Sequence, residues 1–196
     1  MQKEIKVLAK KILYEGFNNV YACELEVPSL DPKKNYNRSF KREVIQCSDA
    51  VFVLIYAPCC DSFVFCQEFR AGVFFNKNDD DPFIFECVAG MIDRDHLPEE
   101  IARAEVYEEA GLTAGKLQLI AKAYSSPGRM TEKVYFFYTE VAGTPQSGLF
   151  GLETENEDIA THIIKRTDAY KMMDELKIMD SMTLLALNWF RANHLF

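Results

Sequence analysis

Three glutamates, Glu105, Glu108 and Glu109, stand close together in the middle of the chain. If this segment is helical, residues three and four positions apart share one face, so their carboxylates gather within roughly 6 Å along the axis. Like charges placed in this way repel one another. Mg²⁺ would relieve that repulsion, because it prefers oxygen ligands and keeps coordination positions for waters and substrate phosphates. The alternative is a solvated acidic helix face, which the bare pattern of three glutamates favours when it is considered alone.

The residues around these glutamates predict the helix that must position them. Pro98 suits the first helical turn, and Glu99 and Glu100 suit the positive end of the helix. Gly111 suits the position just after the last turn, where a left-handed backbone is needed. We therefore predict a helix over residues 98–110.

Composition limits the classes of partner. The chain has 196 residues, 48% of them hydrophobic, which is enough to bury a sizeable core. A net charge of −8 argues against non-specific binding to nucleic acid or to an anionic membrane surface, because both require clustered Lys and Arg. No apolar run approaches the length of a membrane span, and the first residues do not form a signal peptide. A soluble, cytoplasmic protein is the resulting expectation.

The six cysteines follow neither a zinc-binding spacing nor a disulfide framework. Four of them lie in runs of aromatic and β-branched residues. We therefore predict that all six are reduced core residues; they are Cys23, Cys47, Cys59, Cys60, Cys66 and Cys87.

The rest of the chain predicts many strands and few helices. A hairpin buried on both faces is expected from two apolar runs, 49–57 and 62–75, separated by a turn sequence. Further strands are expected at 6–16, 17–28, 39–46, 83–90, 116–126, 132–141 and 159–166, and helices at 167–177 and 181–195. Strands interleaved with three helices, without strict βαβ repetition, indicate an α+β fold or mixed-sheet sandwich rather than a doubly wound fold.

The segment from Gly90 to Leu112 resembles the signature of the Nudix hydrolases: Gly, five residues, Glu, seven residues, Arg-Glu, an aliphatic residue, any residue, Glu-Glu, any residue, Gly and an aliphatic residue. Two positions depart from it, because His96 stands at the first Glu and Ala104 at the Arg. Arg103 is one position away and faces about 100° elsewhere on a helix. The matching residues are Gly90, Glu105, Val106, Glu108, Glu109, Gly111 and Leu112.

The resemblance covers nearly the whole chain and is to the ADP-ribose pyrophosphatase branch of that family. The strings "LYEGF", "QEFR", "ECVAGMI" and "GLETENEDI" fall in the branch's order and spacing. The resemblance implies a Nudix α/β/α sandwich with a mixed sheet over residues 47–196. It also implies a small N-terminal β segment, residues 1–46, that is exchanged across a homodimer.

The resemblance assigns a metal site to the acidic helix. Glu105 and Glu109 are implied as the principal Mg²⁺ ligands, with Mn²⁺ as a possible substitute, and the carbonyl of Ala89 completes the inner shell. Glu108 lies beside them and is assigned to catalysis. His96 is expected to be solvated or to cap the helix.

A second acidic group is implied in the loop that contains Glu155 and Glu157. One of these carboxylates, assigned as Glu155, activates water, and Glu157 meets a metal. A loop suits a base that must close over its substrate. A charged surface turn is the alternative for this segment.

Four residues are implied in substrate binding. Arg70 matches a phosphate-binding arginine, whose planar fork suits diphosphate oxygens, and Glu132 matches a substrate-loop glutamate. Phe17 and Arg42 match positions that sandwich the nucleobase, with Arg42 supplied by the partner subunit. Each of three residues also has a structural alternative: Arg70 could be an exposed arginine at a strand end, Phe17 a core residue and Arg42 a surface residue.

The implied activity is magnesium-dependent hydrolysis of ADP-ribose or other ADP-sugars to AMP and a sugar phosphate. GDP-mannose or another nucleotide sugar is the competing substrate, because a neighbouring branch shares most of these motifs. A weakly active nucleotide-sugar binding protein is the alternative from a different class. It rests on His96 and Ala104, whose replacement of a supporting pair could loosen the metal site.

Overall fold

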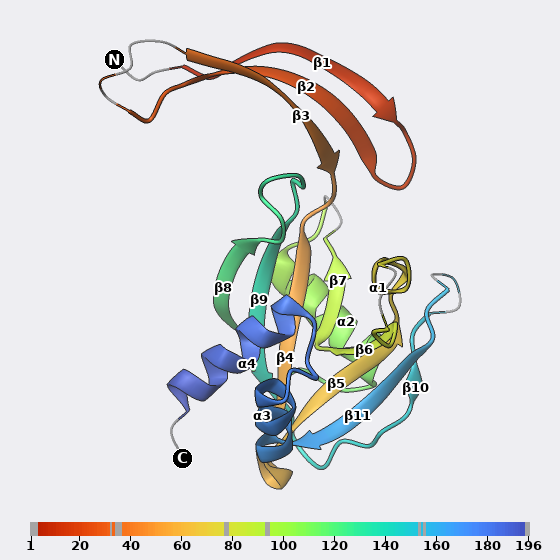
Figure 1. Cartoon of the computed structure of the whole chain (residues 1–196). Coiled ribbons are helices and arrows are strands. Elements are labelled where there is room, and N and C mark those ends of the chain that lie inside the picture. The colour runs from red at the N-terminus through yellow and green to blue at the C-terminus, as the bar shows by residue number, and fades with distance from the viewer. Residues whose placement is uncertain are drawn as a thin grey trace. The chain divides into compact units, whose positions relative to one another are not determined.

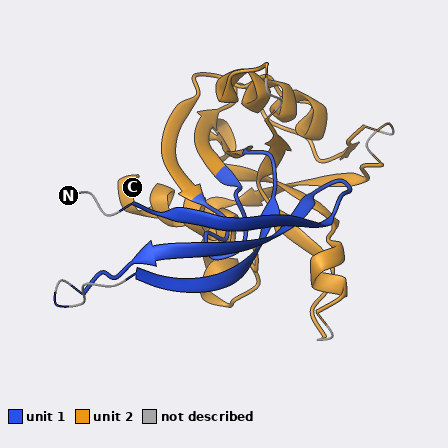
Figure 2. Cartoon of the chain, turned by 90° about the horizontal axis from the view of Figure 1, so that it is seen from above, with its two compact units in different colours: residues 1–49, 124–133 blue, residues 50–123, 134–196 orange. Residues whose placement is uncertain are grey.

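The computed structural model describes residues 4–31, 33, 37–76, 79–92, 95–152, 154 and 156–194. The chain divides into two compact units, coloured separately in Figure 2. Unit 1 comprises residues 1–49 and 124–133, and unit 2 comprises residues 50–123 and 134–196. Each unit is described on its own below.

Unit 1 is a three-stranded antiparallel sheet of long, curved strands (Figure 1). Its strands are β1 (Lys6–Tyr14), β2 (Asn19–Pro28) and β3 (Asn37–Gln46). The segment 124–133 is tied to the end of β3, because the Ile45 amide donates to the Arg129 carbonyl at 2.8 Å and the Thr131 amide donates to the Ile45 carbonyl at 3.1 Å. No described residue of this unit is buried.

Unit 2 is built on a mixed sheet with the order β10-β11-β5-β4-β9-β8, in which β6 also pairs with β5 and β7 with β4. The β4–β9 pair is parallel. The strands are β4 (Ala50–Ala57), β5 (Ser62–Phe69), β6 (Phe83–Glu86), β7 (Val88–Met91), β8 (Gln118–Tyr124), β9 (Lys133–Glu140), β10 (Leu149–Phe150) and β11 (Ile159–Lys165).

Helices cover both faces of this sheet because the central strand β4 is apolar on both sides. Val51, Val53 and Ile55 share one buried cluster with apolar residues of α2 (Pro98–Ala110). Phe52 and Leu54 alternate with them and share the second cluster with residues of α3 (Arg166–Asp174) and α4 (Ser181–Asn193). The predicted α+β class with a mixed-sheet sandwich is confirmed, and Figure 1 shows the layers.

The predicted helix and the predicted hairpin are also confirmed. Helix α2 spans Pro98–Ala110, and Gly111 ends it with a φ of +64°. The Glu100 carboxylate accepts a hydrogen bond from the Leu97 amide at 2.9 Å, which satisfies one of the unpaired donors of the first turn. β4 and β5 form an antiparallel hairpin around the short 3-10 turn η1 (Pro58–Cys60).

Two predicted strands were wrong in extent. The run 62–75 is not one strand, because β5 ends at Phe69 and the single helical turn α1 (Ala71–Phe74) follows Arg70. The run 83–90 is two strands, because β6 pairs with β5 whereas β7 pairs with β4, and the chain changes neighbours at Cys87. Aromatic and β-branched composition marks both segments as extended but does not show where the pairing partner changes.

The cysteine prediction was correct in one part and wrong in another. All six cysteines are free. Only Cys66 and Cys87 are buried, however, and Cys59 is exposed because it lies in the turn that follows Pro58. Among the described residues, no helix is both long and apolar enough to cross a membrane.

Candidate active site

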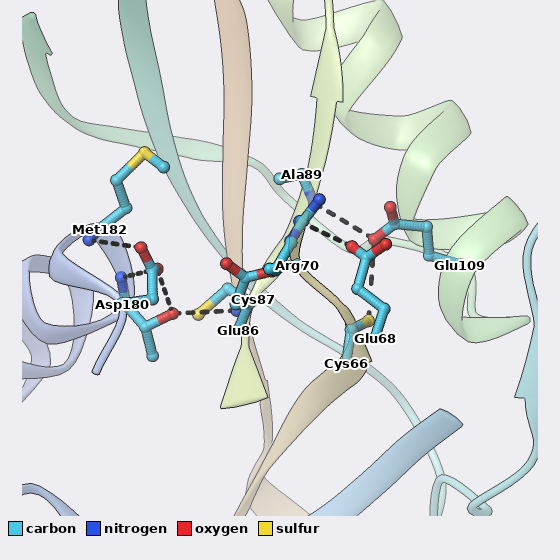
Figure 3. Close-up of polar contacts among 10 residues, drawn as sticks. Cys66, Glu68, Arg70, Glu86, Cys87, Ala89, Glu109, Asp180 and Met182 are labelled. Atoms are coloured by element: carbon cyan, nitrogen blue, oxygen red, sulfur yellow. Dashed lines mark hydrogen bonds and ion pairs between the residues drawn. The ribbon is translucent and has the colours of Figure 1, made fainter. Parts of the chain in front are cut away.

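The acidic face of α2 lies against strand β7 in unit 2. The Glu109 side chain is only 4% exposed, and its Oε2 accepts hydrogen bonds from the Ala89 amide at 3.2 Å and from the Cys66 thiol at 3.7 Å. The Glu105 carboxylate lies directly over Gly90, so that a Cβ at residue 90 would overlap it. Three of the predicted metal-binding residues, Ala89, Glu105 and Glu109, therefore lie together (Figure 3 shows Ala89 and Glu109).

The electrostatics of this face are those of crowded carboxylates. Burial is the main reason why the pKa of Glu109 is raised to about 9, and repulsion from Glu105 adds to it. Glu68 and Glu157 contribute further repulsion, whereas the Ala89 hydrogen bond acts in the opposite direction. The predicted metal-binding Glu157 is thus near enough to influence Glu109. Its own carboxylate accepts a hydrogen bond from the Leu152 amide at 3.1 Å.

The donor set fits a hard divalent cation, because it offers carboxylate oxygens with an excess of negative charge that a cation would offset. No three His, Cys, Asp or Glu side chains in the described part of the chain are already grouped closely enough to enclose a metal ion. In this arrangement Glu109 Oε2 accepts the hydrogen bonds from the Ala89 amide and the Cys66 thiol.

Arg70, the predicted diphosphate-binding residue, follows β5 directly and forms two ion pairs (Figure 3). Its Nε donates to Glu86 Oε2 at 2.6 Å, and its terminal nitrogen Nη2 lies 2.6 Å from Glu68 Oε1. Burial lowers the pKa of Arg70, but the carboxylates of Glu86 and Glu68 outweigh this effect, and the pKa is raised.

Glu86 is buried more deeply than its partner arginine. Its side chain is 9% exposed, compared with 41% for Arg70. Burial therefore outweighs the ion pair and raises the pKa of Glu86 to about 7. Burial is also the main cause of the raised pKa of Glu68.

Sequence reasoning did not single out Glu86 or Glu68. Both contacts depend on the pairing register of β5 and β6, in which Glu68 lies opposite Ile84 and Glu86 lies opposite Cys66. One signal was available, because each glutamate ends or nearly ends an otherwise apolar strand of unit 2. Glutamates are rarely buried without a partner.

The three other predicted substrate residues belong to unit 1. Phe17 is 84% exposed. Arg42 is exposed on β3, where its guanidinium lies 4.6 Å from the Phe40 ring centre and donates to the Lys41 carbonyl at 2.8 Å. Glu132 is half-buried, and its carbonyl accepts a hydrogen bond from the Ser125 amide at 3.3 Å.

Of the two residues assigned to catalysis, Glu155 lies outside the described residues. Glu108 is half-buried on α2, and its backbone carbonyl accepts a hydrogen bond from the Gly151 amide at 3.4 Å. This contact links the acidic helix to the loop that follows β10.

The two departures from the Nudix signature are both exposed, His96 before α2 and Ala104 within it. The neighbouring Arg103 donates to the carbonyls of Ala114 at 3.1 Å and Gly115 at 2.8 Å. It also forms an ion pair with Glu99 at 3.3 Å. Arg103 therefore anchors the loop after α2 through these contacts.

Comparison with known proteins places this arrangement in a family. No family model matches the chain. An ADP-ribose pyrophosphatase of Haemophilus influenzae is 30% identical over 98% of this chain and 88% of its own length. A GDP-mannose pyrophosphatase of Shigella flexneri is 29% identical over 100% of this chain and 99% of its own length. A crystal structure of an ADP compounds hydrolase, 16% identical, superposes with a TM-score of 0.73 over 96% of this chain and 93% of that one, which supports the fold.

The mixed sheet between helices is the fold that this chain shares with the ADP compounds hydrolase. The full-length relatives are named pyrophosphatases, which makes this chain an enzyme of the hydrolase class. The 30% identity to the Haemophilus influenzae protein, which extends over 98% of this chain, also shows the family. The chain belongs to the Nudix family of pyrophosphatases, alongside relatives named ADP-ribose pyrophosphatase and GDP-mannose pyrophosphatase.

Proposed function

We propose that this protein hydrolyses the diphosphate of ADP-ribose to AMP and a sugar phosphate, in a reaction that requires Mg²⁺. The observation that carries the proposal is the buried Glu109 carboxylate, crowded by Glu105 beside Gly90, on the helix that matches the Nudix signature. A buried carboxylate repelled by its neighbour lowers stability, and such a cost is typical of a functional site.

Ala89, Glu105, Glu109 and Glu157 would hold the Mg²⁺, and Mn²⁺ could replace it. When bound, the ion would offset negative charge on the diphosphate and lower the pKa of a bound water. The fit rests on the oxygen-only donors and on the burial of Glu109, which together with repulsion from Glu105 raises its pKa to about 9.

The remaining residues of the proposed site bind substrate and move protons. Arg70 would bind diphosphate oxygens through its guanidinium, whose side chain is 41% exposed and so accessible from solvent. Glu155 would accept the proton of the attacking water, and Glu108 would assist from α2. The cytoplasmic location expected from the sequence stays a prediction.

Unit 1 would complete the site by dimerisation through residues 1–46. Phe17 and Arg42 would hold the nucleobase, with Arg42 supplied by the partner subunit, and Glu132 would contact substrate. Support comes from the exposure of apolar side chains on β1, where Val7 is 64% and Tyr14 is 61% exposed. Several exposed apolar side chains on one strand are a feature expected of an interaction site.

The proposal is tested by incubating the purified protein with Mg²⁺ and, separately, ADP-ribose, GDP-mannose, UDP-glucose and a dinucleotide, and measuring the released nucleoside monophosphate. We expect the highest kcat/KM for ADP-ribose and no turnover after chelation of the metal. A preference for GDP-mannose would favour the second candidate, which the Shigella flexneri relative supports. Binding of these compounds without turnover would favour the nucleotide-sugar binding protein.

A further inference from the structure

Arg70 is held between two carboxylates on neighbouring strands. Glu68 lies two residues before it on β5, and Glu86 ends β6, the strand that pairs with β5. The Arg70 amide also donates to the Pro82 carbonyl at 2.8 Å, just before β6 begins. The arginine is therefore fixed at its backbone and at its guanidinium, and Figure 3 shows the guanidinium contacts.

The two contacts leave the arginine able to bind another group. A guanidinium has five N–H donors, and the contacts at 2.6 Å use its Nε and Nη2 atoms. The Arg70 side chain is 41% exposed, whereas those of Glu68 and Glu86 are 18% and 9% exposed. The carboxylates thus lie on the protein side, and the arginine presents the accessible surface.

Glu86 is itself held in place through the next residue. The Cys87 amide donates to Thr183 Oγ1 at 3.1 Å, and this hydroxyl donates to Asp180 Oδ2 at 2.7 Å. Asp180 is the N-cap of α4 and accepts hydrogen bonds from the Met182 and Thr183 amides. The start of α4 therefore fixes the β6–β7 junction that carries Glu86, as Figure 3 shows.

We propose that Glu86 is a positioning residue, which holds the guanidinium of Arg70 in the orientation that binds the substrate diphosphate and does not itself contact substrate. The inference rests on the proposed function. A bidentate or forked contact to a phosphate depends on the plane of the guanidinium, and a deeply buried acceptor at Nε fixes that plane. Glu86 therefore acts on substrate affinity through Arg70.

The test is a double-mutant cycle of Glu86→Gln and Arg70→Ala. The readout is the Kd, by calorimetry with Mg²⁺, for an ADP-ribose analogue whose bridging diphosphate oxygen is replaced by methylene. We expect Glu86→Gln to weaken binding about tenfold, because the amide keeps the shape but loses the charge-assisted contact. In the Arg70→Ala background the same change should alter Kd less than about twofold, because no guanidinium remains to be positioned.

The matched control is Glu140→Gln, which removes a strand carboxylate of the same unit that accepts a hydrogen bond from the Tyr138 hydroxyl at 2.9 Å. Its Kd should equal that of the wild type. Should Glu86→Gln fail to fold, Glu86→Asp replaces it in the cycle, because it keeps the charge and withdraws the carboxylate by one methylene. Equal weakening by the Glu86 variant with and without Arg70, or no weakening in either, would overturn the proposal.

The proposed function and this inference fail separately. Turnover of ADP-ribose by the wild type, measured independently, tests the function. Normal turnover with an additive cycle overturns the positioning role alone. Absent turnover with a coupled cycle overturns the hydrolytic function and leaves the positioning of Arg70 standing for a binding protein.

Discussion

Unit 1 and unit 2 are both built on β-sheets, but they differ in how their strands are covered. All nine residues of β1 are exposed, and all ten of β2 are only partly buried. In β4, by contrast, seven of the eight residues are buried between two helical layers. A two-sided hydrophobic environment stabilises unit 2, whereas a three-stranded sheet needs an apolar face packed on something to be stable. The comparison shows that the strands β1 and β2 lack the cover that helices give β4, which is the reason for proposing that a partner subunit packs on unit 1.

The largest effect should follow from Glu109→Gln in unit 2. We expect turnover of ADP-ribose to fall at least about a hundredfold, because the variant loses a carboxylate ligand. The melting temperature at pH 7 in the presence of a chelator should change little, because a carboxyl group with a pKa of about 9 is already protonated and uncharged there. Turnover and thermal unfolding are measured on the same samples. Unchanged turnover would contradict the assignment of this helix to the metal site.

Polar substitution on β1 should act on assembly. Val7→Lys combined with Ile12→Lys replaces residues that are 64% and 49% exposed, and we expect the proposed dimer to become a monomer by light scattering. The KM for ADP-ribose should rise about tenfold or more, because the site would lose residues supplied by the partner. Lys11→Gln on the same strand is the control. A wild-type protein that is already monomeric and fully active would contradict the proposed role of unit 1 in dimerisation.

Stability should depend on pH through Glu86 in unit 2. Its pKa is raised from 4.5 to about 7, so the native state keeps a proton that the unfolded chain releases. The resulting contribution to stability is fully present below about pH 4.5 and is lost as the pH rises through about 7. It amounts to about 3 kcal/mol. Denaturant unfolding at pH 5 and pH 8 should show a smaller difference in Glu86→Gln; identical differences would refute the assignment.

A more moderate loss should follow from Gly90→Ala. The new Cβ would occupy the place of the Glu105 carboxylate, which must then move. We expect the Mg²⁺ concentration that gives half-maximal activity to rise about tenfold, with the fold retained, because a displaced ligand weakens the site. Gly72→Ala on α1 of the same unit is the control, since its added Cβ meets no atom within 4 Å. Equal behaviour of the two variants would show that Glu105 is not needed in this position.

The smallest effect on turnover should come from Arg103→Ala. The contacts of Arg103 with the carbonyls of Ala114 and Gly115 predict a structural role, so stability should fall by about 1 kcal/mol. Turnover should change less than about threefold. A large loss of activity would instead indicate that Arg103 supports the metal-binding glutamates in place of the signature arginine.

Local signals explain which parts of the fold could be predicted. Helix α2 was predicted with its observed ends because the signals for those ends are local: Pro98 and Glu100 lie in the first turn, and Gly111 follows the last one. The break between β6 and β7 at Cys87 could not be predicted in the same way. It is the point where the chain stops pairing with β5 and starts pairing with β4, and no local residue pattern marks that change. The amino-acid composition of a segment predicts that it is extended, but it does not predict which strand pairs with it.

The same distinction applies to the candidate site. The spacing of Glu105 and Glu109 follows from helical periodicity, so their shared face could be inferred from sequence. The association of Arg70 with Glu86 could not, because it requires the register of two strands separated by a loop and by α1. Ala104 and His96, which replace the signature's Arg and Glu, are both exposed. The contacts of Arg103 could not be predicted, because they depend on the path that the chain takes after α2.

The parallel pairing of β4 with β9 has a consequence for how the chain acquires its site. The β4–β5 hairpin joins neighbours in sequence, whereas β4 and β9 join residues about eighty positions apart. Closing so long a loop is slow, because its entropy must be lost before the contacts compensate. Helix α2 lies inside that loop and packs on β4 and β7. On a ribosome, therefore, β9 cannot pair until the acidic helix has already been synthesised, and we expect nascent chains that end before residue 140 to be protease-sensitive and inactive.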